Sequence, residues 1–394
     1  MLNFEYYSPT KIIFGRDTEK RAGEEIRKLG CKKVLVHYGS ASAKKSGLLD
    51  RVFQSLEEAG VSYVSLGGAL PNPRLSKVRE GIELARRESV DFLLAVGGGS
   101  AIDSAKAIAY GLAAPERDVW DFFDGTAFPA ACAPVGVILT IAASGSESSN
   151  SCVITKEEGG LKRAVNTDYA RPKFAILNPE LTCTLPAYQT ACGAVDILMH
   201  TQERYFANEK ENELIDRMAE GLMVTVLHNA PTLLEHPSDY HARAELMWAG
   251  SLSHNGLTGT GRQGDFACHK MEHELGGMFD VAHGAGLAAI WGSWARYVLR
   301  HDVGRFAQFA VRVMNCTMDF DNPEAAALAG VRALEDFYRQ MGMPTNLREL
   351  GLDGLTDAQI RKMADKCTNG GKITVGSFVP LRTEDVETIF KMAR

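Results

Sequence analysis

The sequence predicts a two-domain protein, with an N-terminal α/β domain built on a parallel sheet and a C-terminal domain that is all helical. Its 394 residues are too many for a single hydrophobic core, because one domain has roughly 150 residues. Up to about Pro186, short apolar runs alternate with helical patterns, which is typical of a parallel sheet with crossover helices. Beyond Pro186, helical patterns follow one another with few β-branched runs. We therefore expect domains at 1–186 and 187–394.

The elements of the first domain follow from composition and periodicity. Short runs rich in β-branched and apolar residues predict strands at 34–38, 62–66, 91–96 and 136–140. Apolar residues at helical spacing, with charges on the opposite face, predict helices at 48–59 and 75–88. In the second domain the same spacing predicts helix-rich stretches at 187–206, 209–234, 240–254 and 267–278.

Composition and charge favour small-molecule chemistry. The chain is 45% hydrophobic and 23% charged with a formal net charge of -6, so it lacks the basic field that holds a nucleic acid or an anionic membrane. Its eight cysteines are scattered without a C-x-x-C pair, which is typical of reduced thiols in the cytoplasm. The N-terminus does not resemble a signal peptide, and the most apolar stretch, 284–299, falls short of the ~20 residues of a membrane helix. We expect a soluble, cytoplasmic protein.

A glycine-rich turn is the first candidate binding site. The expected strand 91–96 runs into Gly97, Gly98 and Gly99, and a helical pattern follows. Ser100 and, three residues later, Asp103 predict a capping box at the start of that helix. Backbone amides and a helix dipole would meet at this turn, where glycines let phosphates approach, so a pyrophosphate fits. The spacing is not G-x-G-x-x-G, and a tight turn without a ligand remains the alternative.

A second polar turn follows the strand expected at 136–140. It begins at Thr140 and carries Ser144, Ser146, Ser148 and Ser149. These hydroxyls can meet the ribose and nicotinamide groups of a dinucleotide, or they can line a solvated loop.

Histidines and one carboxylate form the second candidate site. His269 and His273 stand four residues apart, which places them on one face of a helix, and His283 follows after two glycines that are expected to end that helix. Asp196 and His200 have the same spacing on another helix. Imidazoles with one carboxylate suit Fe²⁺ or Zn²⁺, with Ni²⁺ and Mn²⁺ also compatible. Spacing leaves open which of the three later histidines bind the metal, and any single one is more often an ordinary hydrogen-bonded residue.

Separate motifs occur in order along nearly the whole chain. They are Tyr7-x-Pro9-Thr10, Phe14-Gly15, Pro71-Asn72-Pro73, Gly97-Gly98-Gly99-Ser100, Thr140-x3-Ser144, Asn178-Pro179-Glu180-Leu181, Asp196-x3-His200-x2-Glu203, His269-x3-His273 and His283-Gly284. In this order they resemble the iron-containing (group III) alcohol dehydrogenases, particularly the butanol dehydrogenase branch.

The resemblance implies a fold and a metal site. The fold would be a dinucleotide-binding α/β domain followed by a helical metal-binding domain, as in dehydroquinate synthase-like proteins. The four metal ligands of the family fall on Asp196, His200, His269 and His283. His273 falls where the family has a non-ligating histidine near the nicotinamide, so we expect it to be catalytic and to relay a proton.

The resemblance also implies cofactor contacts and a homodimer. By motif position the contacts fall on Asn72, Gly98, Gly99, Ser100, Thr140, Ser149 and Lys162. Asp103, Ser144 and Ser146 in the two turns complete the expected cofactor site.

One position predicts the kind of nicotinamide cofactor. Gly39 stands where NAD-using relatives typically carry an Asp, whose carboxylate would bond the ribose 2′-hydroxyl and repel a 2′-phosphate. Ser40, Lys44 and Lys45 follow and could bind that phosphate. We therefore expect NADP(H) to be preferred over NAD(H).

Together these features predict a metal-dependent, NAD(P)-linked alcohol dehydrogenase or aldehyde reductase. The metal would act as a Lewis acid on small primary alcohols and aldehydes of the butanol and butanal kind. The alternatives are a glycerol or polyol dehydrogenase of the same fold and a dehydroquinate-synthase-like lyase. A lyase of that kind needs a basic cluster for an anionic substrate, and none accompanies the expected ligands.

Overall fold

The computed structural model describes residues 1–39 and 41–394. Within them the chain divides into two compact units. One, here the sheet unit, is residues 7–184, and the other, the helical unit, is residues 185–394 together with 1–6.

The sheet unit contains a parallel sheet of six strands. In spatial order they are β1 (Lys11–Phe14), β8 (Phe174–Leu177), β5 (Val135–Leu139), β4 (Phe92–Gly97), β2 (Lys33–Tyr38) and β3 (Ser62–Leu66). Every neighbouring pair is parallel. β4 and β5 are buried along their whole length, which explains their unbroken apolar sequences.

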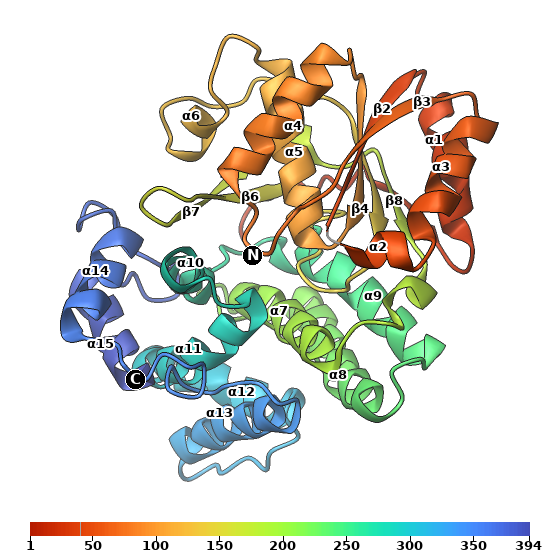
Figure 1. The fold of residues 1–394 in the computed structure, drawn as a ribbon. Helices are drawn as coiled ribbons and strands as arrows, with labels where there is room; N and C mark the ends of the chain where they lie inside the picture. Colours follow the sequence, from red (N-terminus) through yellow and green to blue (C-terminus); the bar gives the residue numbers. More distant parts are fainter. Residues whose placement is uncertain (40) are drawn as a thin grey trace. The chain divides into compact units, whose positions relative to one another are not determined.

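Helices cover both faces of this sheet (Figure 1). α1 (Ala22–Lys28) and α3 (Leu48–Glu58) pack on one face, and α4 (Leu75–Arg87) and α5 (Gly99–Ala113) lie on the other. The remaining elements are the short helices α2 (Ala41–Lys45) and α6 (Trp120–Phe123) and an antiparallel hairpin of β6 (Ser151–Lys156) and β7 (Leu161–Asn166). The short 3-10 helices of the chain are η1 (Thr18–Arg21), η2 (Asp168–Ala170), η3 (Pro179–Thr182), η4 (Leu257–Gly259) and η5 (Leu299–His301).

The helical unit contains the remaining helices. They are α7 (Ala187–Tyr205), α8 (Glu213–Glu235), α9 (Tyr240–His254), α10 (Ala267–Phe279), α11 (His283–Val298), α12 (Val303–Arg312), α13 (Pro323–Gln340), α14 (Asp357–Cys367) and α15 (Thr383–Ala393). The predicted fold class, α/β followed by all-α, is confirmed. The four expected strands match β2, β3, β4 and β5 to within one residue at each end.

Two local predictions are wrong. α5 begins at Gly99 with Gly98 as its N-cap, so Ser100 lies inside the helix and no capping box forms there. The side chain of Asp103 is instead used across space, where it accepts hydrogen bonds from Ser146 and Val153. The glycines after His273 do not end their helix, because α10 continues through them to Phe279 and stops where Asp280 takes a left-handed conformation with φ 54°.

A close backbone approach fixes α11 against α7. A Cβ placed on Gly284 would lie 2.1 Å from the carbonyl oxygen of Cys192, so only glycine permits this contact. Because His283 is the first residue of α11, this packing sets where its side chain begins relative to α7.

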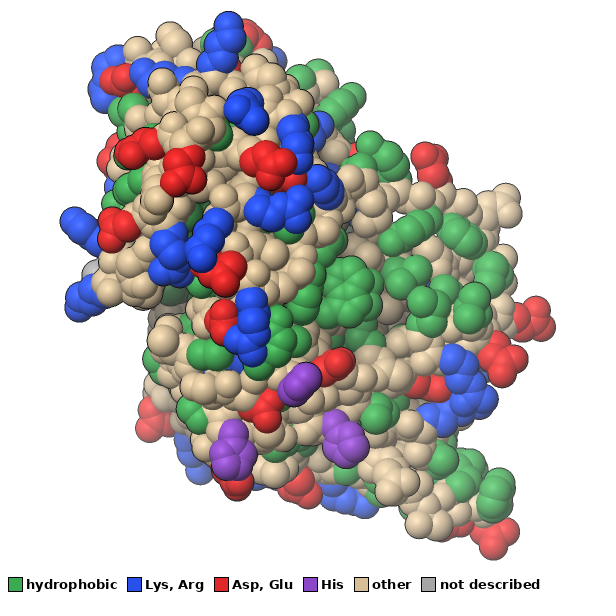
Figure 2. All heavy atoms as spheres, turned by 90° about the vertical axis from the view of Figure 1, so that its right-hand side faces the viewer, with side chains coloured by type: hydrophobic (Ala, Val, Ile, Leu, Met, Phe, Trp, Pro, Cys, Tyr) green, Lys and Arg blue, Asp and Glu red, His purple; other side chains and the backbone are tan. Residues whose placement is uncertain are grey.

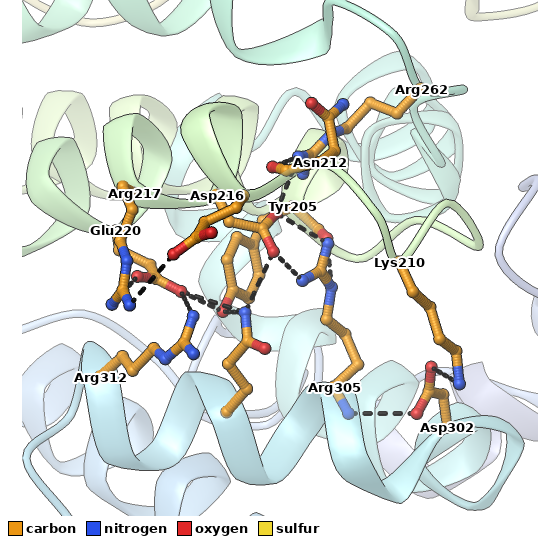
Figure 3. Close-up of polar contacts among 12 residues, drawn as sticks. Tyr205, Lys210, Asn212, Asp216, Arg217, Glu220, Arg262, Asp302, Arg305 and Arg312 are labelled. Carbon is orange, nitrogen blue, oxygen red and sulfur yellow. Dashed lines mark hydrogen bonds and ion pairs between the residues drawn. The ribbon is translucent and has the colours of Figure 1, made fainter. Parts of the chain in front are cut away.

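A buried charged network ties α7, α8 and α12 together (Figure 3). Asp216 accepts from Arg262 at 2.7 Å and from both terminal nitrogens of Arg305, at 2.5 and 2.9 Å. Glu220 accepts from Tyr205, the last residue of α7, at 2.9 Å. These carboxylates compensate arginines that are almost wholly buried, so removing one partner would leave an uncompensated charge in the interior.

The surface agrees with the modest net charge. On the face drawn in Figure 2, Lys and Arg side chains lie among Asp and Glu side chains. In residues 1–39 and 41–394, no helix has both the length and the apolar character needed to cross a lipid bilayer.

Candidate active site

Three helices of the helical unit supply a cluster of metal-binding side chains. Asp196 and His200 project from one face of α7, four residues apart, and His269 comes from the first turn of α10. One donor atom from each of these residues lies within 4.8 Å of the other two, and all three residues are buried. His283, at the start of α11, places its Nε2 3.7 Å from Oδ1 of Asp196.

The spacing of these atoms fits a bound cation. Oδ1 of Asp196 lies 3.6 Å from Nε2 of His269 and 3.0 Å from Nδ1 of His200, but its geometry gives it no hydrogen bond among the described residues, and Nε2 of His269 has none either. Burying such atoms without partners is costly. Two donors that bind one metal at about 2.1 Å stand roughly 3.4 Å apart in a tetrahedral arrangement. The two atoms are too far apart for a direct hydrogen bond, but both could bind the same divalent metal.

Two buried carboxylates orient the imidazoles. Oε2 of Glu203 accepts a hydrogen bond from Nδ1 of His269, and Oε2 of Glu272 accepts one from Nδ1 of His283. Each bond keeps a proton on Nδ1, so Nε2 is the nitrogen of each ring that can bind a metal. Sequence reasoning gave neither glutamate a role. Glu203 lies close in sequence to the expected ligand His200, and Glu272 lies close to His269. This proximity indicates a supporting role only if a metal site is already assumed.

His200 is held by the backbone and by a second histidine. Its Nδ1 lies 2.9 Å from the carbonyl oxygen of Asp196, so this nitrogen carries the proton and Nε2 is the free base. The ring of His254 lies edge-on to the ring of His200, with 4.0 Å between centroids. Arg204 donates to Nδ1 of His254 at 2.9 Å and to the backbone carbonyl of His200 at 2.7 Å.

The electrostatics of the cluster suit a cation. Burial alone would raise the pKa of Asp196, but the nearby His200 and His283 hold it well below its usual value, so the carboxylate is ionised. Burial, together with the charge of His269, lowers the pKa of His200 to about 4, so its imidazole is neutral. Burial also acts to lower the pKa of His269, but the charge of Glu203 and contacts with Asp196 outweigh it and raise the pKa to about 9. The metal-free imidazole therefore holds a second proton at neutral pH, which a metal bound at Nε2 would displace.

His273 lies beside this cluster. It is half-buried on α10, one turn beyond His269, and its ring centroid lies 6.2 Å from that of His283. His273 is thus close to the expected ligands but is not part of the converging group Asp196, His200 and His269.

The sheet unit presents the glycine turn as expected. Gly98, Gly99 and Ser100 are half-exposed where β4 ends and α5 begins, at the N-terminus of a long helix, where backbone amides lack intrahelical partners. A Cβ on Gly99 would lie 2.6 Å from Oγ of Ser144, which shows that the second polar turn packs directly against the glycines. The two turns predicted separately therefore lie together.

The other predicted cofactor residues differ in accessibility. Thr140 and Ser144 are half-exposed, whereas Asn72, Ser146, Ser149 and Lys162 are buried. Both carboxylate oxygens of Asp103 are engaged by Ser146 and Val153. Gly39 is half-buried after β2, and Ser40 lies outside the described residues.

Comparison with known proteins covers the whole chain. Residues 9–179 match a family described as iron-containing alcohol dehydrogenase, and residues 190–394 match the C-terminal domain of the Fe-containing alcohol dehydrogenase family. The chain is 38% identical to the NADH-dependent butanol dehydrogenase A of Clostridium acetobutylicum, covering 99% of each chain. It is 35% identical to the NADPH-dependent aldehyde reductase YqhD of Escherichia coli, covering 100% of each. The crystal structure of NADH-dependent butanol dehydrogenase A from Thermotoga maritima is similar, with a TM-score of 0.95, 38% identity and coverage of 100% of this chain and 99% of that one.

Proposed function

The chain belongs to the iron-containing alcohol dehydrogenase family, in the butanol dehydrogenase-like branch, and we propose that it interconverts small primary alcohols and aldehydes with Asp196, His200, His269 and His283 as its metal ligands. As a member of this family it is a metal-dependent, NAD(P)-linked alcohol dehydrogenase or aldehyde reductase. The observation that carries the ligand assignment is the pair of buried atoms without hydrogen-bond partners among the described residues, Oδ1 of Asp196 and Nε2 of His269, 3.6 Å apart.

The donor set favours a transition metal. Three imidazoles and one carboxylate suit Fe²⁺ or Zn²⁺, and Ni²⁺ and Mn²⁺ are also compatible. When bound, such an ion supplies Lewis acidity toward the oxygen of an alcohol or aldehyde, while the nicotinamide supplies or accepts hydride.

The residues of the chain itself have three tasks in this proposal. Glu203 and Glu272 hold the imidazoles of His269 and His283 in the metal-binding tautomer. The buried walls around Asp196 and His200 exclude water, which strengthens every electrostatic interaction inside. His273, beside the cluster but outside it, takes up or delivers the proton of the alcohol at its imidazole.

We propose the nucleotide site at the two packed turns of the sheet unit. Gly98, Gly99 and Ser100 would receive the phosphates on their backbone amides. The residues proposed to complete the site by hydrogen bonds are Asn72, Thr140, Ser144, Ser149 and Lys162.

We further propose that NADP(H) is preferred. The relatives include both NADH-dependent and NADPH-dependent enzymes, so the preference depends on local residues. No carboxylate stands at Gly39, and Lys44 and Lys45 are exposed on α2. Lys77 also lies near Gly39: its Nζ, which pairs with Glu80 at 2.6 Å, would lie 3.5 Å from a Cβ on Gly68, whose amide donates to the carbonyl of Gly39. These lysines could bind a 2′-phosphate.

A single substitution tests this preference. Among the described residues, a Cβ on Gly39 would meet only the carbonyl oxygen of Ala69, at the ordinary contact distance of 3.6 Å, so the position has room for the Cβ of Gly39→Asp. We expect this variant to shift the ratio of kcat/KM for NADPH over NADH at least tenfold toward NADH. Lys173→Gln, which removes an exposed lysine elsewhere, is the control. Equal or better use of NADH by the unmodified protein would contradict the proposal.

The substrate proposal is tested by a metal-defined assay at the nicotinamide absorbance band. We expect the kcat/KM for reduction of butanal to exceed that for reduction of lactaldehyde. Both values should exceed the kcat/KM for oxidation of glycerol. Preference for glycerol would instead support a polyol dehydrogenase. Binding of cofactor and metal without any turnover of these substrates would contradict an alcohol dehydrogenase.

We also propose a cytoplasmic homodimer. Apolar side chains at the N-terminus, Leu2, Phe4 and Tyr6, are 44–55% exposed, and a second copy could cover them. All eight cysteines carry free thiols, as a reducing compartment requires. Light scattering during size-exclusion chromatography tests the dimer, and a monomer at micromolar concentration would refute it.

A further inference from the structure

Lys106 is a buried cation near the proposed nucleotide site. It lies on α5, seven residues after Gly99, and its side chain is 0% exposed. A lysine that closely follows a glycine turn would ordinarily be expected to reach the phosphates. Its Nζ instead lies 2.7 Å from the carbonyl oxygen of Ser146, 3.1 Å from that of Ser149 and 2.8 Å from that of Ser151. Three carbonyls thus account for the three N–H donors of the ammonium.

Asp103 engages the same loop from the preceding turn of α5. One carboxylate oxygen accepts from the backbone amide of Val153 at 3.0 Å, and the other accepts from Oγ of Ser146. Nζ of Lys106 also lies 3.2 Å from that hydroxyl. The two side chains are therefore linked through the hydroxyl of Ser146 and hold both ends of the segment 146–153.

This segment continues the polar turn that forms part of the wall of the glycine turn. The residues just before it are in contact with the glycines, since a Cβ on Gly98 would lie 3.0 Å from Ile141 and one on Gly99 would lie 2.6 Å from Oγ of Ser144. A shift of about 1 Å in the loop would change the space left for the phosphates and move the hydroxyl of Ser149.

We propose that Asp103 and Lys106 are positioning residues for the nicotinamide cofactor: they hold the loop 144–153 against the glycine turn and act on the cofactor through that loop. The loop takes up the three N–H donors of Lys106 and contacts both carboxylate oxygens of Asp103, so both side chains are directed at the loop. The inference rests on the proposed nucleotide site and assigns Asp103 a role different from direct contact.

The test is Lys106→Met, which has a similar volume but no charge and no donor. We expect the Kd for NADPH, measured by fluorescence titration of the full-length protein, to rise at least tenfold. The KM for NADPH should rise in parallel, while kcat at saturating NADPH and the affinity for Zn²⁺ stay within twofold. Hydrogen exchange should accelerate at the amides of 144–153. If Lys106 only stabilised the fold, Lys106→Met would lower the Tm, but it would not raise the KM for NADPH while leaving kcat unchanged.

Controls separate the possible failures. Ile108→Val destabilises α5 on the side that faces Gly81, away from the loop, and should leave the Kd for NADPH unchanged. Gly99→Ala forces its new methyl against Ser144 and should weaken NADPH binding. Normal binding by Gly99→Ala would refute the proposed nucleotide site itself. Weak binding by Gly99→Ala with normal binding by Lys106→Met would refute only the clamp. If Lys106→Met does not fold, Lys106→Gln, which keeps two donors, is judged by the same Kd.

Discussion

Replacing Glu203 by glutamine tests how the protein prepares its metal ligands. Oε1 of Glu203 accepts from the backbone amides of Cys268 at 2.6 Å and His269 at 3.2 Å, and Oε2 accepts from Nδ1 of His269. Glutamine keeps the first oxygen but presents an amide donor to Nδ1. To avoid two facing donors, His269 must move its proton to Nε2, the nitrogen that is needed for the metal.

The magnitude follows from this competition. Loss of such an outer carboxylate typically lowers metal affinity 10- to 100-fold, which corresponds to about 1.4–2.7 kcal/mol. We expect a decrease in this range for Glu203→Gln, because the side-chain oxygen that accepts from the two backbone amides survives and only the tautomer of His269 is disturbed. The isosteric change leaves no cavity, so the Tm of the metal-free protein should change by only a few degrees.

The assay is competition for Zn²⁺ between the metal-free protein and a chromophoric chelator of known affinity. Glu213→Gln, which changes an exposed glutamate in the first turn of α8, is the matched control and should behave like the unmodified protein. A Zn²⁺ affinity of Glu203→Gln within twofold of the unmodified protein would refute the orienting role of Glu203.

The remaining predictions concern the proton relay, the buried charges and pH. His273→Ala should keep its metal, as measured by mass spectrometry, but lower kcat by roughly 10²–10⁴-fold, whereas His269→Ala should lose both metal and activity; loss of metal from the first variant would mean that the ligands are misassigned. Asp216→Ala leaves two buried arginines uncompensated, so the free energy of unfolding should fall by about 3–5 kcal/mol and the Tm by roughly 10 °C in a calorimetric scan; a Tm within 2 °C of the unmodified protein contradicts this. Burial lowers the pKa of His37 to about 4, so below its unfolded value of 6.5 the unfolded chain binds the extra proton and stability falls as the pH drops from 6.5 toward 4. Compared with His37→Gln in urea denaturation, the unmodified protein should lose roughly 2–3 kcal/mol more between pH 7 and 4.5, and equal losses would refute this assignment.

The parts of the fold that could be predicted have strong local signals. β2 and β4 are short apolar runs between helical patterns, and such runs are distinctive in a parallel sheet. β1 and β8 have only four residues each, and although they are neighbours in the sheet, most of the sequence of the sheet unit lies between them. Local sequence therefore cannot predict their pairing or register. The capping-box prediction is wrong because Asp103 accepts hydrogen bonds from Ser146 and Val153, 43 and 50 residues further along the chain. A rule based on local sequence cannot predict such partners.

The candidate site divides in the same way. Helical spacing placed Asp196 beside His200 and His269 beside His273, but it could not choose among the three later histidines. That choice depends on how α7, α10 and α11 pack, and close contacts such as Gly284 against Cys192 determine this packing. Glu272 lies on the same helix as His269 but orients His283 on the next helix, so its role becomes visible only in three dimensions.

The central claim is that a divalent metal at Asp196, His200, His269 and His283 is required to exchange hydride between a nicotinamide and a small aldehyde. The most direct measurement is butanal-dependent oxidation of NADPH by protein stripped with a chelator and then titrated anaerobically with Fe²⁺ or Zn²⁺. We predict that activity disappears on stripping, returns with a break at one metal ion per chain, and does not return in His269→Ala. Undiminished reduction of butanal by rigorously metal-free protein would contradict the account.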